Sequence, residues 1–248
     1  MRIDILTVLP EMVGQALGHS IIKRAIEAGR IEINVVNIRD FATGRHHMTD
    51  DTPCGGGGGM IMMIDPIAAA LVSLPRLAAA PRVLLTDPQG ELFTQAKARK
   101  WAQEEHIVLL CGHYEGVDER VREHLVTESV SIGDYVLTGG ELPALVIADA
   151  LTRLQPGALG DEYAPENDSF AGELLEFPHY TRPRIFRGWE APQILFSGHH
   201  ALITRWRRWH QLQRTRAWRP DIWARFSPSV EDLKLLDETE PAITDPNR

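Results

Sequence analysis

Short apolar runs alternate with helix-like stretches along the first 154 residues of the chain. Extended apolar runs predict strands over residues 2–9, 31–38, 82–85, 107–110 and 126–137. Apolar residues at helical spacing predict helices over residues 10–28, 66–77, 93–105, 117–124 and 142–154. Because the strands are apolar enough to be covered on both faces, we expect an α/β domain with a mostly parallel sheet.

The pattern changes after this point. Residues 155–171 contain two prolines, two glycines and several acids with little apolar periodicity, which predicts a mobile linker. An acidic helix is predicted over residues 231–240. One apolar stripe of a longer predicted helix consists of Leu202, Trp206, Trp209 and Leu212. We therefore divide the chain into an α/β domain (1–154), a linker (155–171) and a helical, arginine-rich domain (172–248).

The net charge of −8 conceals a strongly basic segment. Between Arg182 and Arg225 there are ten arginines opposed only by Glu190 and Asp221, so the segment carries +8 and the rest of the chain −16. An arginine-rich solvated face is one interpretation, and phosphate contacts with a nucleic acid are the favoured one. Five of the six tryptophans also fall here, and at helical spacing we expect them mostly in the core.

Composition also favours a protein of the reducing cytoplasm. Asp4 interrupts the first apolar stretch, where a signal peptide needs its apolar core. No apolar run approaches the roughly 20 residues of a membrane span. Cys54 and Cys111 lack metal-ligand spacing, so we interpret both as small buried thiols.

Two junctions between a strand and glycines give the first indication of a binding site. In the segment 131–143 an extended run breaks at a glycine pair before a helix begins, and the segment 107–120 has the same character. Such junctions leave backbone groups available to a ligand, so adjacent loops of this kind predict one small-molecule site. Glu115 also suits an ordinary helix start. Asp134, expected inside an apolar strand, needs a partner or a ligand.

The glycine run from Cys54 to Met60 lacks the marks of a phosphate-binding loop. No Lys-Ser/Thr pair follows the glycines and no helix begins there, which disfavours a nucleoside triphosphate site. A flexible hairpin and a loop that lets the backbone approach a base or ribose are equally open. We favour solvated loop residues or RNA contacts over metal ligands for the residues just before the run, His46, His47, Asp50 and Asp51.

Several motifs together resemble one known family. They are Pro10–Met12, Arg39–Phe41, Asp50-Asp51 with Gly55–Met63, Asp87–Gly90, Cys111–Gly116 with Asp118–Val121, Ser131–Ala144, Asp168–Phe170, Pro178–Pro183 and Ser197-Gly198. In this order, over nearly the whole length, they resemble the bacterial tRNA (guanine-N1)-methyltransferases of the knotted SPOUT class. That family methylates the guanosine directly 3′ of the anticodon, at position 37 of tRNA.

The resemblance implies a fold and ligands. It implies an α/β domain with a deep C-terminal trefoil knot, which pattern alone would not suggest, and a small all-helical domain that binds the tRNA anticodon stem-loop. S-adenosylmethionine is the implied methyl donor, and the implied assembly is an antiparallel homodimer with composite sites. The implied donor-binding residues are Leu85, Thr86, Pro88, Gly112, Tyr114, Glu115, Gly116, Ile132, Gly133, Asp134, Tyr135, Val136, Leu137, Gly139, Gly140 and Pro143. The implied substrate-binding residues are Asp50, Gly58, Ser169, His179, Arg182 and Ser197.

The resemblance also assigns the catalytic residues. Asp168 corresponds to the general base that removes the proton from guanine N1, and Arg153 to the cation that stabilises charge on O6. Glu115 is expected near the transferred methyl group. Mg²⁺ is associated with activity in the family, but no ligand set in the sequence places it, and we assign no metal ligand.

Five residues depart from the pattern expected of the family: Cys54, Gly58, Asp87, His113 and His199. His113 stands where arginine is expected, which puts one phosphate or base contact in doubt. Asp87 stands where the donor loop has serine. Two alternatives are a knotted methyltransferase that acts on a ribose 2′-OH and a non-catalytic RNA-binding module that kept the fold. The position of Asp168 favours guanine, and intact donor loops disfavour the non-catalytic module.

Overall fold

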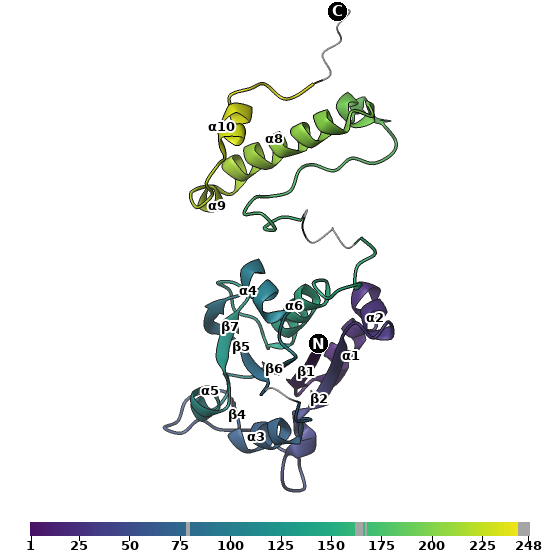
Figure 1. Ribbon diagram of the computed structural model, residues 1–248. Coiled ribbons are helices and arrows are strands. Elements are labelled where there is room, and N and C mark those ends of the chain that lie inside the picture. Colours follow the sequence, from purple (N-terminus) through teal and green to yellow (C-terminus); the bar gives the residue numbers. More distant parts are fainter. Residues whose placement is uncertain (78–79, 162–165, 167, 243–248) are drawn as a thin grey trace, which may run out of the picture. The chain divides into compact units, whose positions relative to one another are not determined.

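The computed structural model describes residues 1–77, 80–161, 166 and 168–242, and it divides into two compact units (Figure 1). The first unit is Met1–Glu162 and the second is Tyr163–Arg248. The division falls within the segment predicted as a linker. Residues 162–165 and 167 of that segment lie outside the described part of the chain.

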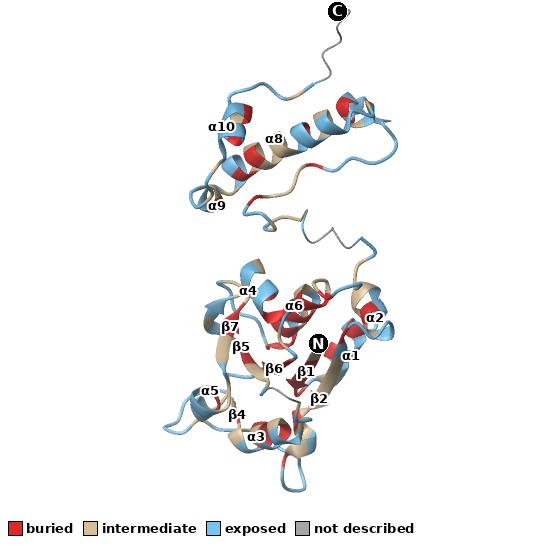
Figure 2. Cartoon of the chain, in the orientation of Figure 1, coloured by how far each residue is buried: buried red, intermediate tan, exposed pale blue. Residues whose placement is uncertain are grey.

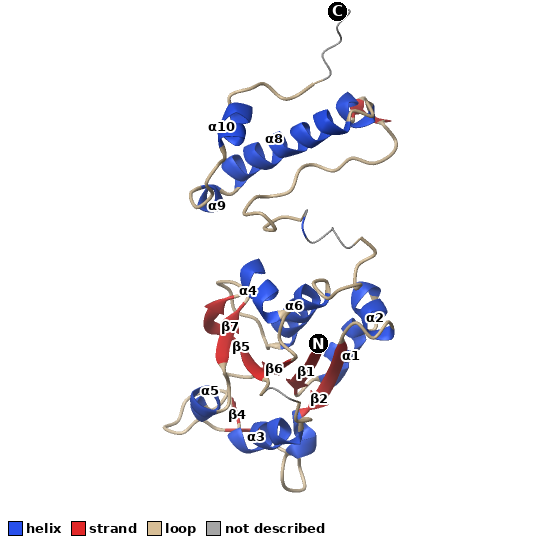
Figure 3. Ribbon diagram, viewed as in Figure 1, coloured by secondary structure: helices blue, strands red, loops and turns tan. Residues whose placement is uncertain are grey.

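A parallel five-stranded sheet forms the centre of the first unit, which confirms the α/β prediction (Figure 3). The strand order is β2-β1-β6-β5-β7, and every neighbouring pair is parallel. The strands are β1 (Arg2–Thr7), β2 (Glu32–Asn37), β5 (Arg82–Leu92), β6 (His106–Cys111) and β7 (Glu128–Ser131). Consecutive parallel strands need crossover connections, and here most of these contain a helix.

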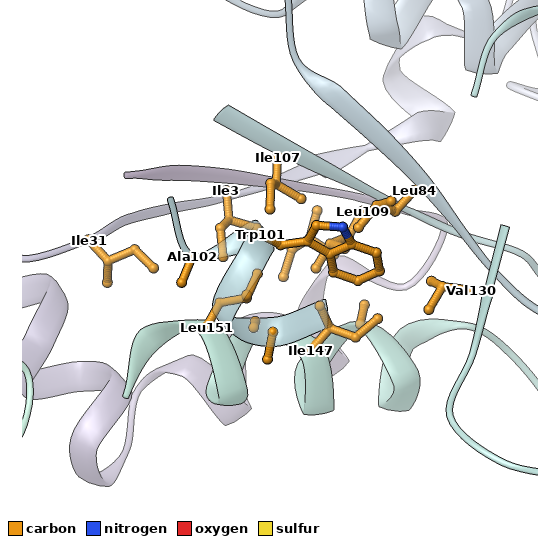
Figure 4. Close-up of a cluster of buried hydrophobic side chains, with 14 of the residues drawn as sticks. Ile3, Ile31, Leu84, Trp101, Ala102, Ile107, Leu109, Val130, Ile147 and Leu151 are labelled. Carbon is orange, nitrogen blue, oxygen red and sulfur yellow. The ribbon is translucent and has the colours of Figure 1, made fainter. Parts of the chain in front are cut away.

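Helices cover both faces of this sheet. Successive side chains of a strand point to opposite faces, and those of the central strands are buried in two separate hydrophobic cores. On β6, Leu109 enters the core beneath one set of helices and Leu110 enters the core beneath the other. The first set comprises α1 (Pro10–Leu17), α2 (Ser20–Glu27), α4 (Gln95–Trp101) and α6 (Glu141–Thr152). The second set comprises η1 (Ile38–Phe41), α3 (Ile64–Ser73) and α5 (Glu119–His124). Figure 4 shows Trp101 buried in the first core, among side chains of the central strands and of α6.

Several predicted elements are wrong in extent; the strand predicted over residues 82–85 continues to Leu92, and the helix predicted over residues 231–240 ends at Leu236. The helix predicted over residues 10–28 is two helices separated at Gly18-His19, and Ser20 opens the second with a φ of 54°. The strand predicted over residues 126–137 ends at Ser131. Asp134 therefore lies in an exposed loop and not inside an apolar strand, so its carboxylate is solvated and needs no buried partner.

The glycine-rich segment forms a small hairpin beside the sheet. Strands β3 (Asp50–Asp51) and β4 (Ile61–Met62) pair antiparallel, and the glycines form the loop between them. Cys54 in this loop is exposed, so the prediction of a buried thiol is wrong for it and confirmed only for Cys111.

The second unit contains a long helix with a small core. It comprises the hairpin β8 (Ile185–Phe186) and β9 (Trp189–Glu190), η2 (Gln193–Phe196), α8 (His200–Trp218), α9 (Pro220–Trp223) and α10 (Val230–Leu236). Leu212 of the predicted stripe is buried with Leu174 and Leu235. Trp206 is buried as well, but Trp189 and Trp218 are exposed, so the prediction that the tryptophans lie mostly in the core fails for these two.

None of the helices in the described part of the chain is both long and apolar enough to span a membrane. No three side chains of His, Cys, Asp or Glu in that part of the chain lie close enough together to hold a metal ion.

Candidate functional site

Three loops, one at a bulge within β5 and two at the carboxyl ends of β6 and β7, enclose a pocket in the first unit. Its volume is about 850 Å³, part of it open to solvent. The lining residues are Thr86, Asp87, Pro88, Gln89, Gly112, His113, Tyr114, Glu115, Gly116, Val130, Ser131, Ile132, Gly133, Tyr135, Val136, Leu137, Thr138, Gly139, Gly140 and Pro143. Five of these twenty are glycines, so backbone forms a large share of the wall. Crevices at the carboxyl ends of parallel strands are where α/β proteins bind ligands.

The first loop is a bulge within β5. The pairing of β5 with β7 shifts register between Thr86 and Glu91, and Asp87, Pro88 and Gln89 of this bulge line the pocket. Asp87 holds this bulge: its carboxylate accepts a hydrogen bond from the backbone N–H of Gln89 (2.7 Å) and one from Arg122 of α5 (2.8 Å). The bulge is therefore anchored to a helix by an ion pair.

The second loop follows β6 and is tied to the glycine-rich hairpin. The backbone N–H of Glu115 donates to Met60 O (3.0 Å), and the N–H of Met62 donates to Gly116 O (2.9 Å). Tyr114 adopts a φ of 60°, and its hydroxyl accepts a hydrogen bond from Arg39. These bonds place the glycine-rich hairpin next to the pocket loop that carries Glu115.

The third loop, from residue 132 to Gly140, passes so close to the second that a side chain would not fit. The N–H of Gly140 donates to Gly112 O at 2.7 Å, and the hydroxyl of Thr86 lies 3.2 Å from Gly140 O. A Cβ on Gly140 would lie 2.0 Å from Thr86 Oγ1 and 2.8 Å from Cys111 Cα. Glycine is therefore required where the three loops meet.

A buried carboxylate lies behind the pocket wall. Glu141, 2% exposed at the start of α6, accepts a hydrogen bond from the Thr7 hydroxyl (2.7 Å), and its other oxygen lies 3.8 Å from His113 Nδ1. Burial raises the pKa of the Cys111 thiol well above its usual value, and the charge of Glu141 adds to this. Cys111 is thus an unreactive thiol within the wall.

The structure brings together fourteen of the sixteen residues that the resemblance assigns to the donor. The other two lie outside the lining: Leu85 is buried in the core and Asp134 is exposed. Six lining residues were not assigned, namely Asp87, Gln89, His113, Val130, Ser131 and Thr138. Asp87 and His113 are two of the five departures from the family pattern, and such a departure inside a donor-loop motif is a sequence signal that could have assigned both to the pocket.

The proposed catalytic residues lie outside the pocket lining. Arg153 follows the last turn of α6, the helix that begins beside the pocket at Gly140. Twelve helical residues separate the two, a distance of about 18 Å. Asp168 belongs to the second unit. Both side chains engage in interactions within the chain.

The assigned substrate residues are distributed over both units. Asp50 lies in β3 and Gly58 in the exposed glycine loop. In the second unit, Ser169 Oγ accepts from the N–H of Glu176, and His179 lies 3.4 Å from the same glutamate. Arg182 is exposed, and Ser197 donates its hydroxyl to Ile194 O. Within the second unit, Ser169 and His179 therefore contact the same glutamate.

The arginines of the second unit are partly neutralised, which sequence reasoning missed. Arg208 pairs with Asp232 (2.7 Å) and Arg205 pairs with Glu238, and both acids lie beyond the basic segment. The Arg208 hydrogen bond holds the pKa of Asp232 below its usual value. Arginines of the segment for which the described residues show no ion pair are Arg182, Arg187, Arg207, Arg214, Arg216 and Arg225.

Fold and pocket together define the class: an α/β protein with a pocket suited to a small ligand, formed by loops at the carboxyl edge of a parallel sheet. The family described as tRNA (Guanine-1)-methyltransferase TrmD matches residues 1–225. Among similar proteins is a tRNA (guanine-N(1)-)-methyltransferase of Moorella thermoacetica, 56% identical over 96% of each chain. Proteins of the same name from Brevibacillus brevis (52%, over 97% of this chain and 98% of the relative) and Staphylococcus carnosus (51%, over 96% of each chain) are also similar. The chain belongs to the tRNA (guanine-1)-methyltransferase family.

Proposed function

We propose that this protein transfers a methyl group from S-adenosylmethionine to N1 of the guanosine at position 37 of tRNA. The observation that carries the proposal is the pocket of strand-to-glycine loops in a chain that matches this family over residues 1–225. The relatives' shared name specifies tRNA, guanine and N1. Position 37 comes from the motif resemblance.

The pocket suits an adenosine-containing donor. It combines backbone from five glycines with apolar side chains such as Ile132, Leu137 and Pro143, the mixture of polar and apolar groups that is typical of small-molecule sites. Those apolar groups can hold the adenine ring, and the loop backbone can bind its polar edge and the ribose. When bound, S-adenosylmethionine supplies an electrophilic methyl on a sulfonium. We further propose that the meeting of the three loops at Gly140 is part of the family's trefoil knot.

The acceptor has to be activated by the protein. Guanine N1 carries a proton and is a poor nucleophile until that proton leaves. Asp168, within hydrogen-bond reach of N1 in the complex, takes the proton as general base. Negative charge then spreads to O6, where the guanidinium of Arg153 stabilises it. Once N1 is held in line with the methyl group, methyl transfer needs no further activation.

The position of Arg153 supports the proposal of a homodimer. At about 18 Å along α6 from Gly140, Arg153 is too far to reach the pocket of its own chain. The exposed face of α6 carries Leu142 and Val146, followed on the same face by Asp149 and Arg153 at helical spacing. A second copy that covers these apolar side chains would meet Arg153 at the edge of the contact. Each site would then take its catalytic side chains from the neighbouring copy.

The test is to locate the methyl group and then remove the base. Purified protein is incubated with bulk tRNA and the donor, and the modified nucleotide is mapped by mass spectrometry. We expect 1-methylguanosine at position 37. A 2′-O-methylated ribose would contradict the proposal, and so would an absence of donor binding by calorimetry.

Asp168→Asn should then reduce turnover by a factor of about 100 or more, with donor binding kept. Glu173→Gln is the matched control, because Glu173 is an exposed carboxylate on the same stretch of chain. Near-normal turnover of the Asp168 variant would refute the assigned base.

A further inference from the structure

The hairpin β8–β9 of the second unit has a tight turn that places two aromatic rings together. Arg187 and Gly188 form the turn with φ values of 52° and 83°, as a two-residue turn of the I′ kind requires. Phe186 and Trp189 are directly paired across the strands, so their side chains lie on the same face. Their ring centroids are 6.1 Å apart.

Both rings are open to solvent. Trp189 is 71% exposed and Phe186 is 52% exposed, whereas Trp206 on the neighbouring helix α8 is buried. In Figure 2 the whole hairpin has the colour of exposed residues. Packing within the unit therefore does not account for two large aromatic side chains in adjacent positions.

Two arginines of this segment lie over aromatic rings. The guanidinium of Arg187 lies 5.2 Å from the centre of the Phe186 ring. Arg184 lies 4.9 Å from the centre of Phe196, another exposed ring, and it is paired with Glu190 at 3.0 Å. Glu190 is the only acid between residues 182 and 190, against three arginines. The hairpin thus combines exposed aromatic faces with excess positive charge.

We infer that this hairpin binds the tRNA substrate, with Trp189 stacked on an unpaired nucleobase other than the target guanosine and Arg187 on a neighbouring phosphate. Aromatic side chains beside arginines are how proteins hold splayed-out bases of single-stranded RNA loops. A second copy of the chain is the weaker occupant, since two such hairpins would bring like charges together. The inference rests on the proposed function and adds a specific contact surface to it.

The test compares two exposed tryptophans of the same unit in the full-length protein. Trp189→Ala should raise the Kd for tRNA and the KM for tRNA by about tenfold, with kcat and donor binding unchanged. Trp189→Phe should retain most of the affinity, because a phenyl ring still stacks. Trp218→Ala separates the hairpin from the helix: Trp218 is 63% exposed at the end of α8, beside Arg214, and its loss should change the Kd much less. An equal rise of the Kd would mean that exposed aromatic side chains in general, and not the hairpin, make the contact, and it would overturn the inference.

A second variant tests the phosphate contact. Arg187→Gln should lower the slope of log affinity against log salt concentration by about one. Unchanged tRNA affinity and salt slope in the Trp189 and Arg187 variants would overturn the inference. So would a changed monomer–dimer equilibrium in light scattering with tRNA binding per dimer unaltered. Failure of the proposed function looks different, because the unmodified protein would then leave tRNA guanosine unmethylated.

Discussion

In the unit Met1–Glu162 the candidate site is made largely of loop backbone, whereas in the unit Tyr163–Arg248 the candidate contacts are side chains on a helix and a hairpin. The pocket loops are fixed by bonds such as Gly140 N–H to Gly112 O. The second unit carries arginines and aromatic rings, and some of the arginines form ion pairs with acidic residues of the same chain. A small donor of fixed shape can be bound by a rigid backbone, whereas a long polyanion is better bound by many side chains that can adjust to it.

The largest effect is expected where the backbone of the pocket is most crowded. Gly140→Ala places a methyl group 2.0 Å from Thr86 Oγ1 and 2.8 Å from backbone atoms that cannot yield. We expect donor binding to be lost in calorimetry, with the unfolding midpoint lowered as well.

Gly14→Ala is the control for this substitution. Gly14 lies in α1 with open space around its Cβ position, so alanine there should preserve binding and raise stability by about 0.5–1 kcal/mol. If the Gly140 variant binds the donor at normal affinity, the loops can separate without a cost in free energy. The contrast between a rigid backbone site in the first unit and adjustable side chains in the second would then be wrong.

A smaller effect is expected at the ion pair that anchors the β5 bulge. Arg122→Met removes the partner of Asp87 and should raise the donor Kd by about tenfold, since a hydrogen bond to a charged group contributes about 1.5 kcal/mol. Arg120→Met is the matched control from the same helix. Arg120 is exposed, and its ion-pair partner among the described residues is Asp118, which lies outside the pocket lining, so its loss should leave the Kd nearly unchanged. Equal effects of both variants would show that the charge of α5, and not the anchor, is what matters.

The smallest effect concerns the stability of the second unit. Arg208 lowers the folded-state pKa of Asp232, so this pair stabilises the fold above about pH 4, the unfolded value, and the gain disappears as pH falls through the lower folded value. Asp232→Asn should therefore cost about 1 kcal/mol at neutral pH, a figure kept modest because Arg208 is partly exposed.

Denaturant unfolding at pH 7 and at pH 3 measures this difference. The deficit of the Asp232 variant should shrink at pH 3. A deficit of the same size at both values would mean that the helix cap at Ser229, and not the charge pair, carries the contribution.

The central strands were predictable because β6 is buried on both faces, which leaves an uninterrupted apolar run. The break between α1 and α2 was not, since Ser20 takes a left-handed conformation that no residue-type preference signals. The pocket glycines could be recognised from the sequence as residues of a binding loop. The reason that glycine is required there lies in contacts between residues distant in sequence, such as Gly140 with Thr86. The pairing of Arg205 and Arg208 with acids beyond the basic segment had no local signature either.

The close approach of the loops at Gly140 has a consequence for inhibition. A compound that binds the pocket chiefly through loop backbone contacts few side chains of the protein. Few substitutions could therefore exclude the compound without also excluding the natural donor. Substitutions at the exposed lining residues Tyr135 or Val136 leave the Gly140–Gly112 bond in place. Substitution of Gly140 itself would displace the compound and the natural donor together, so resistance through that residue would also remove the activity.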